Sequence, residues 1–392
     1  MTQSKNKPII SVFIHCFPPA RGGLEYLMGE IKKILDEKYE VHIITGRGLN
    51  LDSYKTFSNF TNDKSINIHR LELNYFWQRI ANKFLNKIIF KIGFFSPYYF
   101  GPILEYTPEI IDIIKKSDLI IGAGMPTKMF YDSYLFAKKY NKKLILHPSY
   151  HNVSYYNHCP QFQKTLNYAS TIIYQTKQEI DGLIANYKVD KKKLIQMAYN
   201  EYTSKQIKEI KLKKINQKNI ILGFVGQVTL RKNLIVFKNY LDKYLSYWNK
   251  QNIKLNILIA GTKTNSAHEI EKLFDKYLKN KTVDIIYDFS DTQKSTIFNK
   301  IDIFVSPSHE ESLGIVNFEA IFHGLPIIVH KDSAFEEFLK ESDKFKTINE
   351  LHQSILNHLR HPHSQISILN KYNQDIYRSS LNQLISSLIQ IK

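Results

Sequence analysis

The sequence has 392 residues, enough for two or three domains that each bury a full core, and this length excludes a miniprotein held together by disulfides. Apolar residues make up 43% and charged residues 23%, as in ordinary globular proteins, so a largely disordered or collagen-like chain is also excluded. The 54 Lys and Arg against 36 Asp and Glu give a net charge of +18, which requires an anionic partner or another cause.

The basic charge comes mostly from lysine, since only seven of the 54 cations are Arg. Lys, Asn, Ile and Tyr have AT-rich codons and are all abundant here, so part of the charge is expected from codon bias. The cysteines Cys16 and Cys159 are too few for a disulfide framework or a four-Cys zinc site, which favours a reducing compartment. No apolar run reaches the roughly 18 residues of a spanning helix, so we expect a cytoplasmic protein that is soluble or peripheral.

Short apolar runs alternate with longer helical patterns along the whole chain, which is typical of β-α-β units around parallel sheets. In the first half the expected strands are residues 9–15, 41–45, 119–123, 143–147, 171–175 and 193–197. In the second half they are residues 220–226, 255–260, 283–287, 301–306 and 326–330. This pattern predicts two doubly wound domains, whose ligands bind beyond the carboxyl ends of the strands, in a cleft that the domains face.

A charged tract without Gly or Pro separates the two series of strands. We therefore expect a first domain over residues 1–202, a linker over 203–218, a second domain over 219–375 and a C-terminal helix over 376–392.

The most informative segment follows the expected strand 301–306 and reads PSHEESLGIVNFEAIFHGLPIIV. Gly314 lets the backbone approach a ligand closely, and the first amides of the helix that follows favour an anion such as a phosphate. Glu311 and Glu319 bracket this point at a spacing of eight. The chain has no Asp-x-Asp pair for a hard metal ion, so we interpret the two carboxylates as acceptors for sugar hydroxyls and expect no metal.

These residues resemble a known family. The pattern PS-x-x-E-S-x-G…FEA…G-x-P, with its Glu-x7-Glu, is similar to the second-domain signature of the retaining family-4 glycosyltransferases, which have the GT-B fold of two Rossmann-like domains. Three further segments are similar to that family in the same order: FPPARGGLEYLMGEI near the first strand, FVGQVTLRKN at the start of the second domain, and ILIAGT with IDIFVSPS after it.

The resemblance implies transfer of a sugar from a UDP- or GDP-linked donor, with retention of configuration and without a cofactor. Glu319 would hold the ribose, Glu311 the hydroxyls of the donor sugar, and Lys232 the leaving phosphate, while His147 would lie near the reacting sugar. The catalytic candidates are His147, Lys232 and Glu311. The donor-binding candidates are Gly22, Gly23, Gly226, Gln227, Arg231, Lys232, Glu311, Ser312, Leu313, Gly314, Ile315 and Glu319.

Three places depart from the family pattern, one of them Asn200-Glu201 where the family usually has an Asn-Gly turn. Gln227 stands where the family usually has Arg, and Asn233 stands where Gly commonly follows the Lys. Losing a cation beside the diphosphate is expected to weaken donor binding, for which Arg231 would compensate. Because no enzymic nucleophile is evident in the motifs, we favour a front-face reaction over a covalent double displacement.

A basic and aromatic stretch occupies residues 75–100, with Arg79, Lys83, Lys87 and Lys91 at intervals of four. On a helix these cations form one stripe opposite an apolar face. Such a helix either lies on an anionic membrane surface or packs on the first domain with its lysines in water. The family, whose members often extend lipid-linked glycans, favours the membrane.

The sequence thus predicts a sugar transferase that acts on a glycan or lipid-linked acceptor in surface polysaccharide or glycolipid assembly, in the cytoplasm or at the inner face of the plasma membrane. The alternatives are a nucleotide-sugar epimerase, a phosphorylase of the same fold, or a non-catalytic partner subunit. Nucleic acid is not an expected partner, because Arg is scarce.

Four histidines lie close together near the end of the chain: His352, His358, His361 and His363. They match no zinc spacing, and we interpret them as a polar surface tract.

Overall fold

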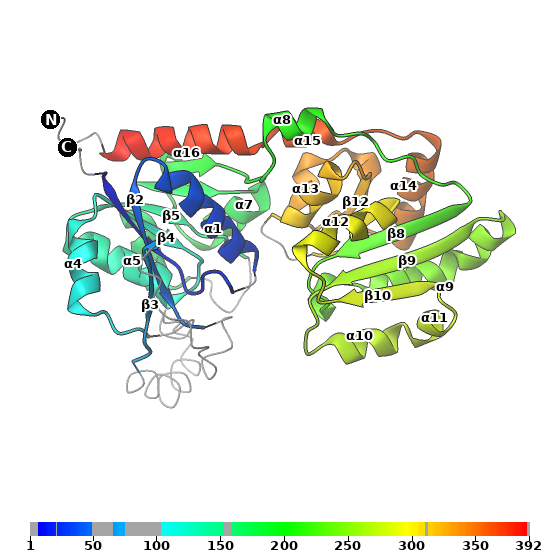
Figure 1. Ribbon diagram of the computed structural model, residues 1–392, viewed down its shortest axis with the longest axis horizontal. Helices are drawn as coiled ribbons and strands as arrows, with labels where there is room; N and C mark the ends of the chain where they lie inside the picture. Colours follow the sequence, from blue (N-terminus) through cyan, green and yellow to red (C-terminus); the bar gives the residue numbers. More distant parts are fainter. Residues whose placement is uncertain are drawn as a thin grey trace. The chain divides into compact units, whose positions relative to one another are not determined.

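The computed structural model describes residues 7–20, 22–48, 66–74, 103–151, 158–309 and 313–389. The chain divides into two compact units. We call them the first domain, Met1–Ala198 with Tyr377–Lys392, and the second domain, Tyr199–Ile376. Each is an α/β domain built on one parallel sheet, which confirms the predicted fold class for the individual domains (Figure 1).

Among the described residues, the first domain has a seven-stranded parallel sheet in the order β3-β2-β1-β4-β5-β6-β7. Its strands are β1 (Ile9–Phe13), β2 (Glu40–Gly46), β3 (Ile68–Leu71), β4 (Leu119–Ala123), β5 (Lys143–His147), β6 (Thr171–Tyr174) and β7 (Leu194–Gln196). All five residues of β4 are buried, because helices cover both faces of a parallel sheet. The strand order reverses between β1 and β4, which makes this pair the switch point of the sheet.

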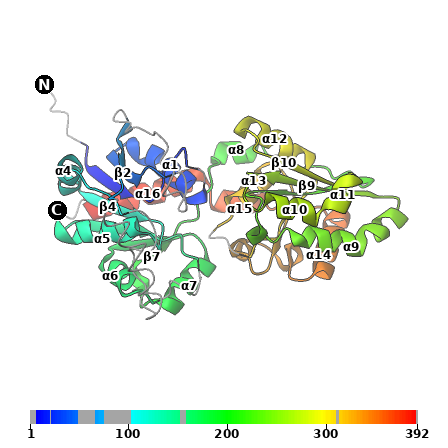
Figure 2. The same cartoon turned by 90° about the horizontal axis from the view of Figure 1, so that it is seen from below.

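The helices of the first domain begin at recognisable caps. They are α1 (Gly23–Asp36), α4 (Pro108–Lys116), α5 (Lys128–Lys139), α6 (Pro160–Tyr168), α7 (Lys177–Asn186) and most of α16 (Gln374–Ile389). The side chains of Thr107, Thr127 and Thr176 accept hydrogen bonds from first-turn amides of α4, α5 and α7. Helix α1 packs on β2 and helix α5 on β1, β4 and β5, and Figure 2 shows these two helices on opposite sides of the sheet.

The second domain repeats this plan with a six-stranded parallel sheet, β10-β9-β8-β11-β12-β13, in its described residues. The strands are β8 (Asn219–Val225), β9 (Lys254–Gly261), β10 (Val283–Tyr287), β11 (Ile303–Ser306), β12 (Ile327–His330) and β13 (Lys344–Phe345). The order reverses between β8 and β11. This second switch point lies at the segment in which the sequence places most donor-binding residues.

Helices cover both faces of the second sheet. They are α8 (Ser204–Lys208), α9 (Ile235–Lys250), α10 (Ala267–Leu273), α11 (Asp275–Lys279), α12 (Asp291–Lys300), α13 (Ile315–Phe322), α14 (Ile348–Arg360) and α15 (Ile366–Lys371). Figure 2 shows α9 and α14 on one side of the sheet and α12 and α13 on the other. Trp248, Phe237 and Phe274 are fully buried in the core under α9.

Every strand that the sequence predicts is present, with its ends within two residues of the expected ones. The short strands β3 and β13 were not predicted. Strand β13 is formed by only two residues, Lys344 and Phe345, too few for any periodic pattern. Strand β3 has only four residues, IHRL, with two basic side chains between two apolar ones, so it shows no apolar run or alternation.

The segment 203–218, expected to be a linker, is part of the second domain. The backbone N–H of Lys213 donates to Gly324 O at 3.0 Å, and its Nζ lies 3.5 Å from Asp302 Oδ1. Gly324 has a φ of +72°, and a Cβ there would lie 2.1 Å from Lys211 O, so only glycine permits this approach.

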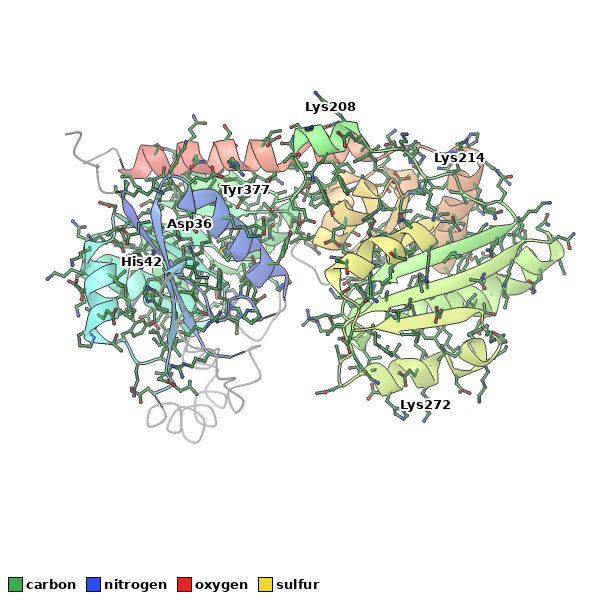
Figure 3. The ribbon with its side chains drawn as sticks, in the orientation of Figure 1. Asp36, His42, Lys208, Lys214, Lys272 and Tyr377 are labelled. Atoms are coloured by element: carbon green, nitrogen blue, oxygen red, sulfur yellow. The ribbon has the colours of Figure 1, made fainter. Side chains whose placement is uncertain are left out.

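The C-terminal helix α16 belongs mostly to the first domain. Its side chains Tyr377 (labelled in Figure 3), Leu381 and Ile385 are buried. Ser386 Oγ lies 3.1 Å from Tyr39 Oη, and Arg378 forms an ion pair with Glu37 at the end of α1. Helix α16 therefore packs against the segment around the end of α1.

The interpretation of the histidines as a surface tract is wrong for two of them. His352 and His358 are 4% and 0% exposed. Both lie on the face of α14 that also buries Leu351 and Ile355, because residues three or four apart share one face of a helix. His352 stacks on Tyr244, and its Nδ1 lies 3.0 Å from Tyr240 Oη. Burial lowers the pKa of His352 to about 4, so this imidazole is a neutral core residue.

The lysines that the structure describes are spread over the surface. Figure 3 labels Lys208, Lys214 and Lys272, which are exposed on three separate elements and point outward. This arrangement agrees with a diffuse lysine background. No helix in the described part of the chain is both long and apolar enough to cross a bilayer.

The close approach of two glycines at the ends of β8 and β9 gives a stability test. A Cβ on Gly261 would lie 1.5 Å from the carbonyl oxygen of Gly226, a backbone atom that cannot move aside cheaply. We expect Gly261→Ala to lower the free energy of unfolding by roughly 3 kcal/mol, measured by urea denaturation.

The control is Gly29→Ala inside α1, where the new Cβ would make an ordinary 3.5 Å contact with Pro18. This variant is expected to be as stable as wild type or to be more stable by roughly 1 kcal/mol. Wild-type stability in Gly261→Ala would contradict the packing of these strand ends.

Candidate functional site

The first domain gathers polar groups at its switch point. His15 follows β1 and Gly124 follows β4, and a Cβ on Gly124 would lie 3.2 Å from His15 Nδ1. His15 Nε2 lies 3.1 Å from Oε1 of Glu25, in the first turn of α1. His15 is 6% and Glu25 9% exposed, and His15 Nδ1 has no hydrogen-bond partner among the described residues. The buried contact between His15 and Glu25 therefore lies at the switch point of the sheet, where ligands of such sheets usually bind.

The predicted residues Gly22 and Gly23 form the entry to α1. A Cβ on Gly22 would lie 2.0 Å from Glu25 Oε2, whereas a Cβ on Gly23 would meet none of the described residues within 4 Å. Gly22 thus leaves room for the Glu25 carboxylate, and Gly23 leaves open space at the helix start.

The predicted His147 ends β5 and is 1% exposed. Its Nδ1 lies 3.2 Å from Ser149 Oγ, and its Nε2 is buried without a hydrogen-bond partner. Burial lowers the pKa of His147 to about 4, so the ring is neutral near pH 7 and its Nε2 can accept or donate one hydrogen bond.

A buried carboxyl group holds the loop that follows His147. Glu179 Oε1 accepts from the backbone N–H of Tyr150 at 3.1 Å, and its Oε2 accepts from that of Gln175 at 2.8 Å. Burial outweighs these hydrogen bonds and raises the pKa of Glu179 to about 7. Glu179 is therefore a positioning residue of this loop.

The second switch point joins the loops after β8, β11 and β12. Asn233 has a left-handed backbone with φ of +54°, and its Nδ2 lies 3.1 Å from Pro307 O and 2.8 Å from His309 Nε2. The ring of His309 packs 4.0 Å from that of His330 at the end of β12. This explains the departure from the family pattern: Asn, like Gly, tolerates the left-handed region, and its side chain also links the loops.

Gly314 starts α13 in the left-handed region, with φ of +74° and ψ of +60°. This conformation favours glycine and turns the chain so that the first amides of α13, which lack intrahelical partners, face outward from the helix start. Asn317 N donates to Gly314 O at 2.9 Å and closes the first turn. The predicted neighbours Leu313 and Ile315 are buried and half-buried respectively.

Glu319 is 8% exposed, which excludes its interpretation as a solvent-facing carboxylate. Its Oε1 lies 2.5 Å from Lys294 Nζ on α12, while Oε2 is buried and has no hydrogen-bond partner in the part of the chain that the structure describes. One oxygen is thus held by a cation and the other is an available acceptor. Leaving a buried carboxylate oxygen unpaired is costly, which points to a ligand hydroxyl that completes it.

Further buried polar groups flank α13. Neither polar atom of Asn317, which is 0% exposed, has a hydrogen-bond partner among the described residues, and the same holds for the hydroxyls of Ser306 and Ser308 after β11. Such orphaned groups are uncommon in folded proteins and mark a place where a ligand or water is expected.

The remaining predicted residues divide into two sets. Gln227 and Arg231 are exposed and Lys232 is half-buried, all in the loop between β8 and α9 that includes Gly226. The predicted residues Glu311, Ser312, Arg79, Lys83, Lys87 and Lys91 lie outside the residues that the structure describes.

Sequence reasoning missed several residues of these two sites. Glu25 was visible in the segment GGLE, and Asn317 stands out as an amide in an otherwise apolar helix. Lys294 gave no signal, because it comes from another helix 25 residues before its partner Glu319.

A comparison with known protein families finds a match in the second domain. Residues 205–364 match the family model described as glycosyl transferases group 1. The matched residues all lie within the second domain. The match contains α13, Glu319, Lys232 and the loops of the second switch point.

Two curated relatives are similar over part of their length. The alpha-monoglucosyldiacylglycerol synthase of Acholeplasma laidlawii is 23% identical over 48% of this chain and 49% of its own. The capsular polysaccharide biosynthesis glycosyltransferase CapM of Staphylococcus aureus is 26% identical over 38% of this chain and 40% of its own. The matched part thus spans about half the length of these relatives or less.

Solved structures match the whole chain. Sucrose-phosphate synthase of Thermosynechococcus elongatus has a TM-score of 0.68 at 14% identity, covering 99% of this chain and 100% of that chain. Anabaena Alr3699/HepE, solved in complex with UDP, has a TM-score of 0.64 at 12% identity, covering 97% of this chain and 100% of that chain. At these identities the likeness establishes the fold, which is the predicted GT-B architecture of two α/β domains.

The buried His147 gives a test by titration. The pKa of His147 is about 4 in the folded protein, whereas that of an unfolded His is about 6.5. Between about pH 4 and about pH 6.5 the unfolded chain therefore binds a proton at His147 that the folded protein does not bind. Folding stability should therefore fall as the pH drops from 6.5 toward 4. We expect the His147 ring resonance in ¹³C-edited NMR to titrate near pH 4, with His147→Asn used to assign it.

The same variant separates this effect from that of other groups. Between about pH 7 and about pH 5, wild type should lose about 2 kcal/mol more unfolding free energy than His147→Asn. A titration midpoint near pH 6.5 would show that the ring is not buried as described.

Proposed function

We propose that this protein is a retaining glycosyltransferase that moves a sugar from a nucleotide-diphosphate sugar, without a metal, to a glycan or lipid-linked acceptor in surface polysaccharide or glycolipid assembly. The observation that carries the proposal is Glu319, a buried carboxylate with one oxygen held by Lys294 and the other unpaired, in the helix that follows the left-handed Gly314. The family match over residues 205–364 and the similarity to a glycolipid synthase and a capsular polysaccharide glycosyltransferase support it.

The diphosphate is proposed to bind at the start of α13. There the first amides and the positive end of the helix dipole favour an anion, and the left-handed Gly314 carries no side chain to block it. Lys232 and Arg231, in the loop after β8, would add positive charge on the neighbouring side of the switch point. Gln227 supplies no charge there, so Lys232 and Arg231 would neutralise the negative charge of the diphosphate.

Glu319 Oε2 is proposed to accept a hydrogen bond from a ribose hydroxyl. Lys294 would orient the carboxylate through its contact with Oε1. Glu311 would hold hydroxyls of the donor sugar, as the family resemblance implies. The orphaned amide of Asn317 is a further candidate for contact with the nucleotide.

The reaction is proposed to proceed on one face of the sugar. As the glycosidic bond to the diphosphate breaks, negative charge develops on the leaving phosphate, and cations and preoriented amides stabilise it without reorganisation. The leaving phosphate oxygen would then take the acceptor proton. His147, which is neutral and buried, is suited to contact a sugar hydroxyl without competing with the phosphate as a charged group.

The acceptor is proposed to be carried by a membrane, with the protein attached peripherally at the inner face of the plasma membrane. The supporting observations are the cation stripe from Arg79 to Lys91 in the sequence and the similarity to a relative that is a glycolipid synthase.

Turnover measurements separate the proposed transferase from a non-catalytic subunit, an epimerase and a phosphorylase. An epimerase releases nucleotide without acceptor, a phosphorylase requires inorganic phosphate, and a non-catalytic subunit binds donor without turnover.

Nucleotide binding tests the donor site. We expect isothermal titration calorimetry to show one site for UDP or GDP, and Glu319→Gln to weaken binding at least about 10-fold, because a charged hydrogen-bond acceptor is lost. Glu269→Gln on α10 removes an exposed carboxylate and is expected to bind as wild type does. If wild type binds neither nucleotide, the proposal fails.

Membrane attachment is tested separately by flotation with anionic liposomes. We expect wild type to float with vesicles that contain phosphatidylglycerol and to float less when Lys83, Lys87 and Lys91 are changed together to Gln, since each basic residue near an anionic surface contributes about 1 kcal/mol. The matched control changes Lys208, Lys214 and Lys272, which are exposed on the second domain. Equal flotation of both triple variants would indicate that the stripe packs on protein.

A further inference from the structure

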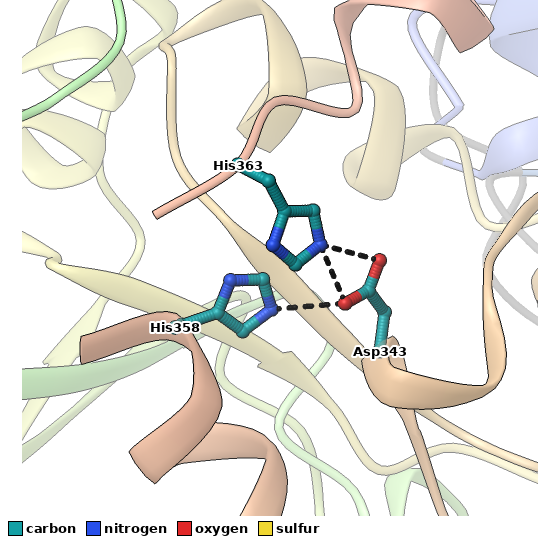
Figure 4. A group of neighbouring side chains, drawn as sticks. All are labelled: Asp343, His358 and His363. Carbon is teal, nitrogen blue, oxygen red and sulfur yellow. Dashed lines mark hydrogen bonds and ion pairs between the residues drawn. The ribbon is translucent and has the colours of Figure 1, made fainter. Parts of the chain in front are cut away.

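Three side chains outside the donor site converge in the second domain: Asp343, His358 and His363 (Figure 4). Asp343 ends the short 3-10 helix Glu341–Asp343 before β13, His358 lies in the last turn of α14, and His363 follows that helix. Asp343 Oδ1 lies 3.2 Å from His358 Nε2 and 2.8 Å from His363 Nε2. One potential ligand atom from each residue lies within 4.8 Å of the other two.

The tautomer of His363 is determined by its other nitrogen. His363 Nδ1 lies 3.2 Å from the carbonyl oxygen of His361, which can only accept, so Nδ1 carries the hydrogen. A neutral ring then points the lone pair of Nε2 at the Asp343 carboxylate, which is unfavourable. The pair therefore needs a positive charge between them, either a proton or a metal ion. A ring N–H bonded to a backbone carbonyl is also the usual second-shell arrangement of a metal-bound histidine.

His358 distinguishes these two possibilities. It is 0% exposed, and its Nε2 contacts Asp343 Oδ1 at 3.2 Å as an ion-pair contact, but neither ring nitrogen has hydrogen-bond geometry with any of the described residues. A proton on His363 would satisfy only His363 and leave this buried imidazole orphaned. A metal ion would bind both Nε2 atoms and the carboxylate oxygen together.

The carboxylate is also held in place for such a role. Gln365 Nε2 donates to Asp343 Oδ2 at 3.0 Å, and the same amide pairs with the backbone N–H and carbonyl of Ile327. Asp343 is 1% exposed, so these hydrogen bonds fix the orientation of a buried side chain. Gln365 thus fixes Oδ2, which also lies 3.1 Å from His363 Nε2, while Oδ1 faces both histidines.

We propose that Asp343, His358 and His363 bind a zinc ion. Zinc takes imidazole nitrogen and carboxylate oxygen at about 2.0–2.2 Å, which in a tetrahedron separates ligand atoms by about 3.4 Å. The present separations of 2.8 and 3.2 Å need to open by only a few tenths of an ångström. The fourth position is left to water, because His363 is 27% exposed at this edge of the cluster and gives the ion access. Magnesium and calcium are disfavoured, since they prefer oxygen ligands.

The ion would be structural rather than catalytic. Ile327 is the first residue of β12 and Asp343 directly precedes β13, so the cluster lies at the amino edge of the sheet. The donor site lies at the carboxyl edge, after β8, β11 and β12. Zinc would fasten the end of α14 and the loop after it to the start of β13.

The experiment titrates Zn²⁺ into full-length, tag-free protein that has been stripped with a chelator, in competition with a chromophoric zinc indicator. We expect one tight equivalent for wild type, and at least roughly 100-fold weaker binding for His363→Gln and Asp343→Asn. The control His361→Gln changes an exposed neighbour but keeps the backbone carbonyl, and it should bind as wild type does.

His363 is partly exposed, so His363→Gln is expected to fold, and circular dichroism checks this. In addition, Zn²⁺ but not Mg²⁺ should raise the thermal unfolding midpoint of wild type and not that of His363→Gln. Wild type that binds no stoichiometric zinc, or a folded His363→Gln that binds it as tightly as wild type, would overturn the proposal.

Discussion

The arrangement of both sites follows from one constraint, the reversal of strand order in a parallel sheet. Where β8 and β11 lie side by side, the chain leaves one strand toward β9 and the other toward β12, so their loops diverge at the carboxyl edge. In the second domain Asn233 links the loops through Pro307 and His309. In the first domain Gly124 and His15 meet at the equivalent point between β4 and β1. The polar groups of each site are grouped around these reversals.

Buried and unsatisfied groups give the second site its chemical character. Glu319 has one oxygen on Lys294 and one without a partner, and Asn317 has two unpartnered polar atoms. A protein folded only for stability would avoid these costs, because each buried unpaired group is unfavourable. The proposed nucleotide accounts for them together with the anion-favouring start of α13. The proposed zinc accounts in the same way for His358 at the opposite edge of the sheet.

The sequence was sufficient for most of the fold because buried parallel strands are continuous apolar runs, such as residues 119–123 and 143–147. It failed for β3 and β13, which are too short for a pattern, and for His352 and His358, whose helix face was not recognised. Within the site, Gly314 and Glu319 could be found because they share one local motif. The partners Lys294 and His15 could not, since only tertiary folding brings them to Glu319 and Glu25.

The central claim is that α13 receives a nucleoside diphosphate, with its phosphates at the helix start and its ribose on Glu319. A crystal structure of the protein soaked with UDP and with GDP tests it most directly. The account predicts diphosphate oxygens within hydrogen-bond distance of the first amides after Gly314, and a ribose hydroxyl on Glu319 Oε2. A nucleotide bound elsewhere in the molecule, with Glu319 contacting only Lys294, would contradict it.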